Sequence, residues 1–198
     1  MESETRTPSR RSDGLADPPE PSRRAAIVFE RGDDVDGALN DFLDAARRGG
    51  ARVAGLVQEH GDEGNCDIHD VRVRDLTRGA TIPIMQDLGP EATGCRVDPR
   101  GVAAAAGLIG KAIEGEPDLL IVSCFGRLEF EGGGMLAEIG DAVVRGVPVV
   151  ICVPARYRDA WNEFAGGLDA QLPPRSADIE AWWATIAPSA IDASYVAT

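Results

Sequence analysis

Apolar and polar positions follow one another in blocks that are typical of alternating strands and helices. Residues 25–30 and 52–58 each hold a short apolar run that predicts a strand. Between them, apolar residues recur every three or four positions from Val35 to Ala46, so they line one face of a helix. The pattern therefore predicts a strand–helix–strand unit near the start of the chain.

The stretch Asp118–Gly134 joins a buried strand to a polar, glycine-rich segment. An unbroken apolar run from Leu119 to Val122 is typical of a strand that is buried on both faces of a parallel sheet. Ligands of open α/β sheets bind at the carboxyl ends of the strands, so the residues after Val122 are candidates for binding or catalysis. An ordinary strand-to-helix connection is the alternative interpretation.

The remaining pattern extends the α/β alternation and adds one irregularity. Period-two alternation in residues 67–76 and a short strand at 81–86 predict a small antiparallel excursion. Asp98 followed by Pro99 marks the start of a helix that continues to about residue 114. Further expected elements are a helix at 134–145, a strand at 147–153, a helix around 157–164 and a last helix at 179–186. Together they predict a three-layer α/β fold with a mostly parallel sheet.

The charge is unevenly distributed along the chain. Residues 1–24 hold five arginines and five acids, so the formal net charge of −13 falls on the remainder. Because this first segment has few apolar residues, we expect a disordered tail at 1–24 and a single α/β domain at 25–198. The acidic domain argues against nucleic acid or an anionic membrane as partner, while oligomerisation stays open. No apolar run is long enough to span a bilayer and no signal peptide is evident, so a cytoplasmic location is expected.

The loop where P-loop proteins bind phosphate lacks the residues for that task. Between the first strand and the first helix the chain reads Glu30–Gly37 and contains no lysine, and Lys111 is the one lysine of the chain. Asp33, Asp34 and Asp36 place negative charge at the positive end of the helix dipole, where they stabilise the helix and repel a triphosphate. Nucleotide triphosphate binding by the usual route is therefore not expected.

A second candidate for an anion site lies directly before the helix that starts near Pro99. The Thr93 hydroxyl, the Gly94 backbone, Arg96 and the free amides of that helix could converge on an anion. The same surroundings favour the thiolate form of Cys95, which would make it nucleophilic or metal-binding. The alternative is a well-capped helix with Arg96 paired to a nearby acid.

Metal binding has weaker support from the sequence. His60, Cys66 and His69 are suitable ligand types, but an alternating strand would place Cys66 and His69 on opposite faces. We expect both histidines to be solvated, and the three residues remain weak metal candidates. The four cysteines form no C-x-x-C pair and are expected to be reduced thiols.

Four short motifs together resemble an uncharacterised bacterial domain family that is often associated with molybdenum-transport genes. They are Ala54-Gly-Leu-Val-Gln58, Gln86-Asp-Leu-Gly89, Gly94-Cys-Arg-Val-Asp-Pro99 and Phe125-Gly-Arg-Leu-Glu129. The resemblance covers roughly residues 25–172. It implies a link to molybdenum, and the family has no established activity to carry over.

The layout is also similar to the thermophile-type nucleoside triphosphatases, a more distant P-loop group, which implies a P-loop-NTPase-like (Rossmann-like) scaffold. Where those enzymes carry metal-binding carboxylates, this chain has Ser123 and Cys124, and the phosphate-binding lysine is absent. Only Glu129 matches a possible catalytic carboxylate. Without the lysine and the metal-binding acid, phosphoryl transfer loses its main charge stabiliser and its Mg²⁺ anchor, so the Walker motifs are degenerate.

The leading hypothesis is a non-hydrolysing binding or regulatory protein for a small oxyanion, with molybdate suggested by the family association and no cofactor assigned. The residues predicted to bind the ligand come from two polar segments: Gln86, Asp87, Thr93, Gly94, Cys95, Arg96, Arg127 and Glu129. One alternative is an atypical nucleoside triphosphatase or kinase that uses Glu129. Another is an interaction module with Trp161, Trp182 and Trp183 near a partner, although core packing is the favoured explanation of these tryptophans.

Overall fold

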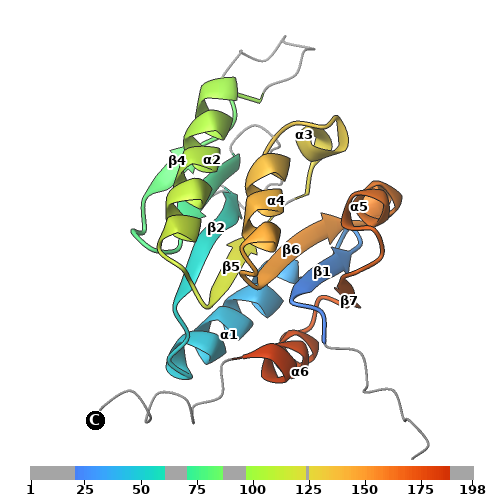
Figure 1. The fold of residues 1–198 in the computed structure, drawn as a ribbon. Coiled ribbons are helices and arrows are strands. Elements are labelled where there is room, and N and C mark those ends of the chain that lie inside the picture. Colours follow the sequence, from blue (N-terminus) through green and yellow to red (C-terminus); the bar gives the residue numbers. More distant parts are fainter. Residues whose placement is uncertain (1–20, 61–70, 87–96, 124, 188–198) are drawn as a thin grey trace, which may run out of the picture.

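A seven-stranded sheet forms the centre of the computed structural model, which describes residues 21–60, 71–86, 97–123 and 125–187 (Figure 1). The strand order is β4-β3-β2-β5-β6-β1-β7. Five strands are parallel: β1 (Arg24–Phe29), β2 (Val53–His60), β5 (Leu119–Val122), β6 (Val149–Pro154) and β7 (Ala170–Leu172). Two are antiparallel: β3 (Val71–Asp75) and β4 (Thr81–Pro83). The prediction of a mostly parallel sheet with a small antiparallel part is confirmed.

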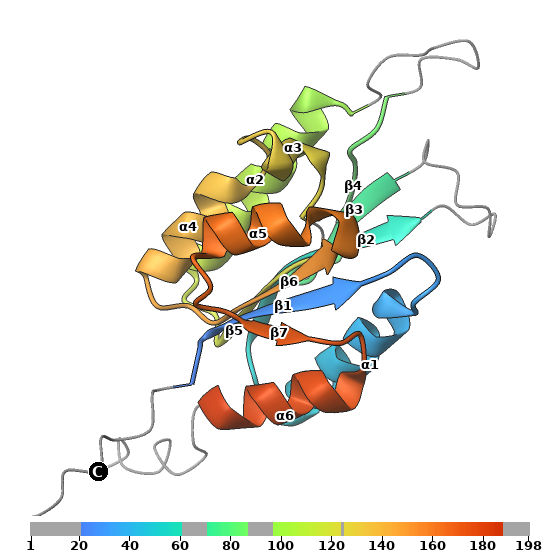
Figure 2. The ribbon, with the colours of Figure 1, turned by 90° about the vertical axis from the view of Figure 1, so that its right-hand side faces the viewer.

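Helices cover both faces of the sheet, as Figure 2 shows. One face carries α1 (Val35–Arg48) and α6 (Ser176–Ile186), and the other carries α2 (Pro99–Glu114), α4 (Leu136–Val144) and α5 (Arg158–Ala165). On β1 the side chains of Ala25 and Ile27 join the core beside α1 and α6, whereas Ala26 joins the opposite core. This alternation follows from the two-residue period of a strand. The protein therefore has the three layers that the sequence predicts.

Aspartate caps stabilise the first turns of α2 and α1. The Asp98 carboxylate accepts a hydrogen bond from the amide of Arg100 at 2.9 Å, and Pro99 occupies the first helical position of α2. At the start of α1, Asp34 accepts from the amide of Gly37 at 2.9 Å. Both caps satisfy amides that a helix leaves without partners at its first turn.

The structure contains short elements that the pattern did not indicate. A four-residue helix, α3 (Arg127–Phe130), follows β5, and a three-residue strand, β7, pairs with β1 at the edge of the sheet. A 3₁₀ turn, η1 (Ala155–Tyr157), precedes α5. These three elements show neither an unbroken apolar run nor a hydrophobic period, so the sequence alone does not indicate them.

Several predictions fall on residues 1–20, 61–70, 87–96, 124 and 188–198, which lie outside the described residues. The division into a disordered tail at 1–24 and a domain at 25–198 stays a prediction. None of the helices in the described ranges is both long enough and apolar enough to cross a membrane.

Candidate functional site

The loop between β1 and α1 is closed by its own carboxylates. Asp33 accepts a hydrogen bond from the amide of Glu30 at 2.8 Å, and Asp34 caps the first turn of α1 through the amide of Gly37. A Cβ atom on Gly37 would lie 2.3 Å from Oδ2 of Asp34, so the cap needs glycine there. The amides that face a phosphate in P-loop proteins therefore meet negative charge from the chain itself.

A phosphate group at this loop would also lack a nearby lysine. Lys111 is exposed on α2, which packs on the opposite face of the sheet from α1. A phosphate placed beside Asp33 and Asp34 would meet two like charges at the helix start. The geometry is therefore unfavourable to a triphosphate at this loop.

A cavity of about 210 Å³ lies at the carboxyl ends of β2 and β5, and we call it the edge cavity. It is bounded by these two strands, by β3, by the start of α2 and by α3. Aliphatic side chains form most of its wall, among them Leu56, Ile84, Val102, Val122, Leu128 and Met135. Polar side chains also line it: Gln58, Ser123, Arg127, Glu129 and Glu131. A largely apolar cavity with a few polar groups is the usual form of a small-molecule site.

Glu129 is a buried carboxylate with both oxygens engaged by the backbone. Its residue is 8% exposed, and its oxygens accept hydrogen bonds from the amides of Gly126 at 2.8 Å and Met135 at 3.0 Å. Buried charge is costly unless hydrogen bonds compensate it, and these two amides do so. Glu129 therefore fixes the loop that carries α3, with its two oxygens committed to that loop.

Two further polar residues that line the edge cavity are Ser123 and Arg127. The Ser123 hydroxyl oxygen accepts a hydrogen bond from the amide of Gln58, which joins the ends of β5 and β2. Arg127 donates from Nε to Oε1 of Glu131 at 2.7 Å, and its side chain is 68% exposed. Arg127 thus lies at the solvent side of the cavity, as an ion pair with Glu131.

The described ends of the predicted anion-binding segment meet at the same cavity. Gln86 donates from Nε2 to the carbonyl of Val97 at 2.7 Å, and the amide of Asp98 donates to the carbonyl of Ile84 at 2.9 Å. Ile84 and Val97 both line the edge cavity together with Arg127. The predicted ligand residues at 87 and 93–96 lie outside the described residues, so their part in the site stays a prediction.

The metal candidates are not tested by the structure. The backbone of His60 ends β2, and nothing is described of its side chain, of Cys66 or of His69. Among the described side chains, no three or more histidines, cysteines and acids gather closely enough to hold a metal ion.

Residues 24–182 match a family model described as "Protein of unknown function (DUF2478)". The chain belongs to this family. Over 165 residues it is also 36% identical to the molybdenum import ATP-binding protein ModC 2 of Bradyrhizobium diazoefficiens. The aligned part is 83% of this chain and 18% of that protein, so the chain spans less than a fifth of the relative's length. The resemblance to a molybdenum-associated domain family is confirmed.

Solved structures of nucleoside triphosphatases share the fold of this DUF2478 chain. A human cancer-related nucleoside triphosphatase has a TM-score of 0.57 at 15% identity, covering 77% of this chain and 88% of that one. THEP1 from the hyperthermophile Aquifex aeolicus has a TM-score of 0.52 at 13% identity, covering 79% and 92% respectively. At these identities the likeness shows the fold alone. The predicted P-loop-NTPase-like fold is confirmed.

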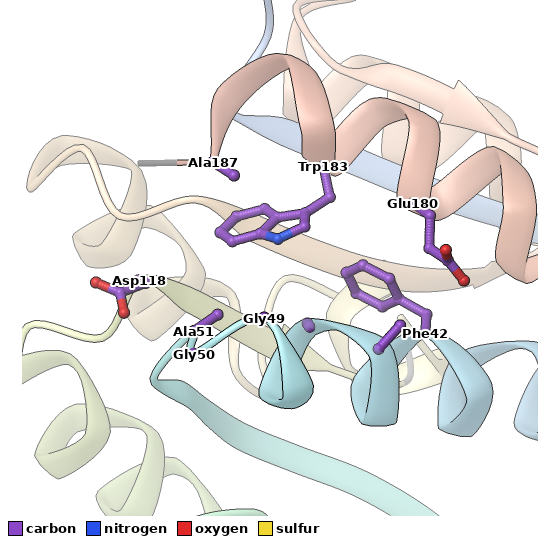
Figure 3. A pocket seen from close by; sticks show the side chains of 10 residues that line it. Phe42, Gly49, Gly50, Ala51, Asp118, Glu180, Trp183 and Ala187 are labelled. Atoms are coloured by element: carbon purple, nitrogen blue, oxygen red, sulfur yellow. The ribbon is translucent and has the colours of Figure 1, made fainter. Parts of the chain in front are cut away.

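A second cavity of the DUF2478 chain, about 340 Å³ in volume, lies at the amino end of the sheet between α1 and α6. Figure 3 shows Trp183 of α6 and Phe42 of α1 pointing toward one another across this space. Asp118 lines it too and is paired with Arg52, whose Nη2 lies 2.9 Å from Oδ1 of Asp118. This cavity was not predicted from the sequence, because its walls come from segments far apart in the chain.

Two of the three tryptophans are core residues. Trp161 is 1% exposed and Trp182 is 6% exposed, and their indole N–H groups donate to Asp169 and to the carbonyl of Ser22. Core packing therefore explains both side chains, as a buried indole with a satisfied N–H usually requires. Neither one offers a surface for a partner.

Proposed function

We propose that this DUF2478 domain binds a small oxyanion without hydrolysing nucleotides, on a P-loop-NTPase-like scaffold. One observation carries the proposal: Asp33 and Asp34 close the β1–α1 loop, whereas a cavity remains at the carboxyl ends of β2 and β5. Ligands of open α/β sheets bind at this edge of the sheet. The proposed binding site is therefore the edge cavity and not the β1–α1 loop.

Molybdate is the first oxyanion to test. The 36% identity to part of a protein named for molybdenum import supports a role in molybdenum homeostasis. In that role the domain would bind the ion, or respond to its concentration, and the neighbouring parts of the transport machinery would act on the result. Sulfate, tungstate and phosphate share the tetrahedral shape of molybdate and serve as comparisons.

Arg96 supplies the positive charge in this proposal, and the other proposed ligand residues of its segment are Gln86, Asp87, Thr93, Gly94 and Cys95. Support comes from the described ends of their segment, because Ile84 and Val97 line the same cavity as Arg127. Hydrogen bonds from a guanidinium to an oxyanion are charge-assisted and stronger than neutral ones. Arg127, which lines the cavity, contributes a second guanidinium.

Isothermal titration of the full chain with molybdate, tungstate, sulfate and phosphate tests the proposal. We expect binding of at least one of them, lost in Arg96→Ala. Arg100→Ala is the matched control. Arg100 is exposed on the first turn of α2, so its substitution removes the same charge close to Arg96 in the sequence. Absence of heat for all four anions, or equal binding by Arg96→Ala and the intact chain, would contradict the proposal.

The enzyme alternative is tested by phosphate release from ATP or GTP with Mg²⁺. Both oxygens of Glu129 accept backbone hydrogen bonds, which leaves this carboxylate poorly placed to activate water. We expect release no faster than in a blank without protein. Mg²⁺-dependent release that Glu129→Gln abolishes would favour the enzyme instead.

A further inference from the structure

Resting on the proposed function, we infer that the edge cavity receives an organic anion, in which an oxyanion group is joined to an apolar body about the size of one aromatic ring. The inference names the chemical class of the ligand at the same site. It follows from the volume of the cavity, from the chemistry of its wall and from the position of its few polar groups.

The volume fits a ring with a small substituent. The edge cavity measures about 210 Å³. An engineered apolar cavity of about 150 Å³ holds one benzene molecule. A bare tetrahedral oxyanion would leave much of the edge cavity unfilled, whereas a six-membered ring with a head group would occupy it.

The wall suits an apolar body beside the oxyanion group. Leu56, Val102 and Leu128 belong to a largely aliphatic lining, which offers no hydrogen bonds to replace the water around an ion. Taking an unpaired charge into such surroundings costs far more than burying a hydrocarbon ring, which is itself favourable. The anionic head group therefore belongs away from the buried carboxylate of Glu129, which also lines the cavity and would repel it at close range.

The head group has a donor at the end of β5. The Ser123 oxygen accepts a hydrogen bond from the amide of Gln58, and this bond does not use its hydroxyl hydrogen. That hydrogen is available to an oxyanion. Val97 and Val102, on either side of the start of α2, also line the cavity.

Titration of the full chain with phosphate, methylphosphonate and phenylphosphonate separates the head group from the body. All three carry the same kind of oxyanion, and only the apolar part grows. We expect phenylphosphonate to bind at least about tenfold tighter than methylphosphonate, because the ring removes apolar surface from water. Benzyl alcohol, which has the ring without the charge, is the fourth probe.

Two variants locate the ring and the head group. Val102→Phe fills the cavity from the first turn of α2, so phenylphosphonate should no longer bind tighter than methylphosphonate. Ala103→Phe adds the same side chain at an exposed neighbouring position and should leave the difference between the two phosphonates unchanged. Ser123→Ala should weaken phenylphosphonate about tenfold and leave benzyl alcohol unchanged, because it removes one hydrogen bond to a charged group. Circular dichroism of each variant verifies that it is folded.

The outcomes distinguish the proposed function, oxyanion binding, from the further inference, binding of an organic anion. Phenylphosphonate bound no tighter than phosphate would overturn the organic-anion inference while molybdate binding still upheld the proposed function. Benzyl alcohol bound as tightly as phenylphosphonate would overturn the anionic head group. Absence of binding for every anion, molybdate included, would overturn both.

Discussion

Gly134 leaves the space that the Glu129 carboxylate fills. A Cβ atom at position 134 would lie 2.0 Å from Oε1 of Glu129, and the backbone there has a φ of +61°. The same carboxylate accepts hydrogen bonds from Gly126 and Met135, so it holds the loop that follows β5 at both ends. This pair of residues therefore sets the position of one wall of the edge cavity.

Substitution of Gly134 by alanine should destabilise the protein by roughly 2 kcal/mol or more, because a positive φ costs an L-residue about 1–2 kcal/mol and the contact with Glu129 adds to it. Urea unfolding followed by circular dichroism measures the change in the free energy of unfolding. The variant should also bind the ligand of the edge cavity less tightly, since the wall that carries Arg127 would shift.

Gly132→Ala is the matched control for this prediction. Gly132 has a φ of +86°, but a Cβ atom there would meet no other atom within 4 Å. The two variants therefore share the backbone cost, and their difference isolates the contact with the Glu129 carboxylate. Equal losses of stability in both would show that the contact contributes nothing.

Glu129→Gln should reduce stability without changing nucleotide turnover. Glutamine keeps one oxygen acceptor and loses the charge, so one of the two backbone amides loses its partner, at a cost of about 1–3 kcal/mol. Glu131→Gln, on the exposed end of α3, should cost far less. Urea unfolding and a phosphate-release assay are measured on the same preparations. A lower rate of phosphate release in Glu129→Gln than in Glu131→Gln would instead identify Glu129 as catalytic.

Asp34→Ala should cost about 1 kcal/mol of stability, the usual loss for an N-cap residue. Asp34 caps α1 through the amide of Gly37, whereas Asp41 is exposed in the middle of the same helix. Asp41→Ala removes the same charge without the cap and should be nearly neutral. Thermal unfolding of both variants gives the comparison, and identical midpoints would show that the cap is not made in solution.

The sequence reveals elements that carry strong local signals. Asp98 and Pro99 mark the start of α2 because an N-cap acid and a proline at the first helical position each satisfy a local requirement of the helix. The strand β5 spans Leu119–Val122, the same residues as the apolar run in the sequence. The run is apolar throughout because a strand in the middle of a parallel sheet is buried on both faces. Such signals depend on neighbours in the sequence alone.

The wall of the edge cavity could not be predicted in this way. Leu56, Val73 and Val102 look like ordinary core residues, and their side chains reach one cavity only through the order β3-β2-β5 and the packing of α2 on β2. The three glycines at 132–134 are visible in the sequence, but nothing local shows that the third one packs against Glu129. Contacts between distant segments depend on strand order, which hydrophobic periodicity does not determine.

Asp118 and Arg52 form an ion pair at the amino end of the sheet, and it makes stability depend on pH. Asp118 accepts hydrogen bonds from the guanidinium of Arg52 at 2.9 Å and from the backbone amide of Arg52 at 2.8 Å. The guanidinium bond is the main reason that the pKa of Asp118 lies below its usual value of 3.8, and partial burial opposes it. A carboxyl whose pKa is lower in the folded state stabilises the fold above its unfolded pKa, and this stabilisation is lost as pH falls through the folded pKa.

Asp118→Asn should therefore lower the unfolding midpoint at pH 7, and the difference from the intact chain should shrink as pH falls below about 4. Added salt should also reduce the difference at pH 7, because the pair is partly exposed to solvent. Glu116→Gln is the control, since Glu116 lies near Arg52 and acts on it only through its charge. A difference between Asp118→Asn and the intact chain that stayed constant from pH 7 to pH 2 would show that Asp118 stabilises the protein by packing alone.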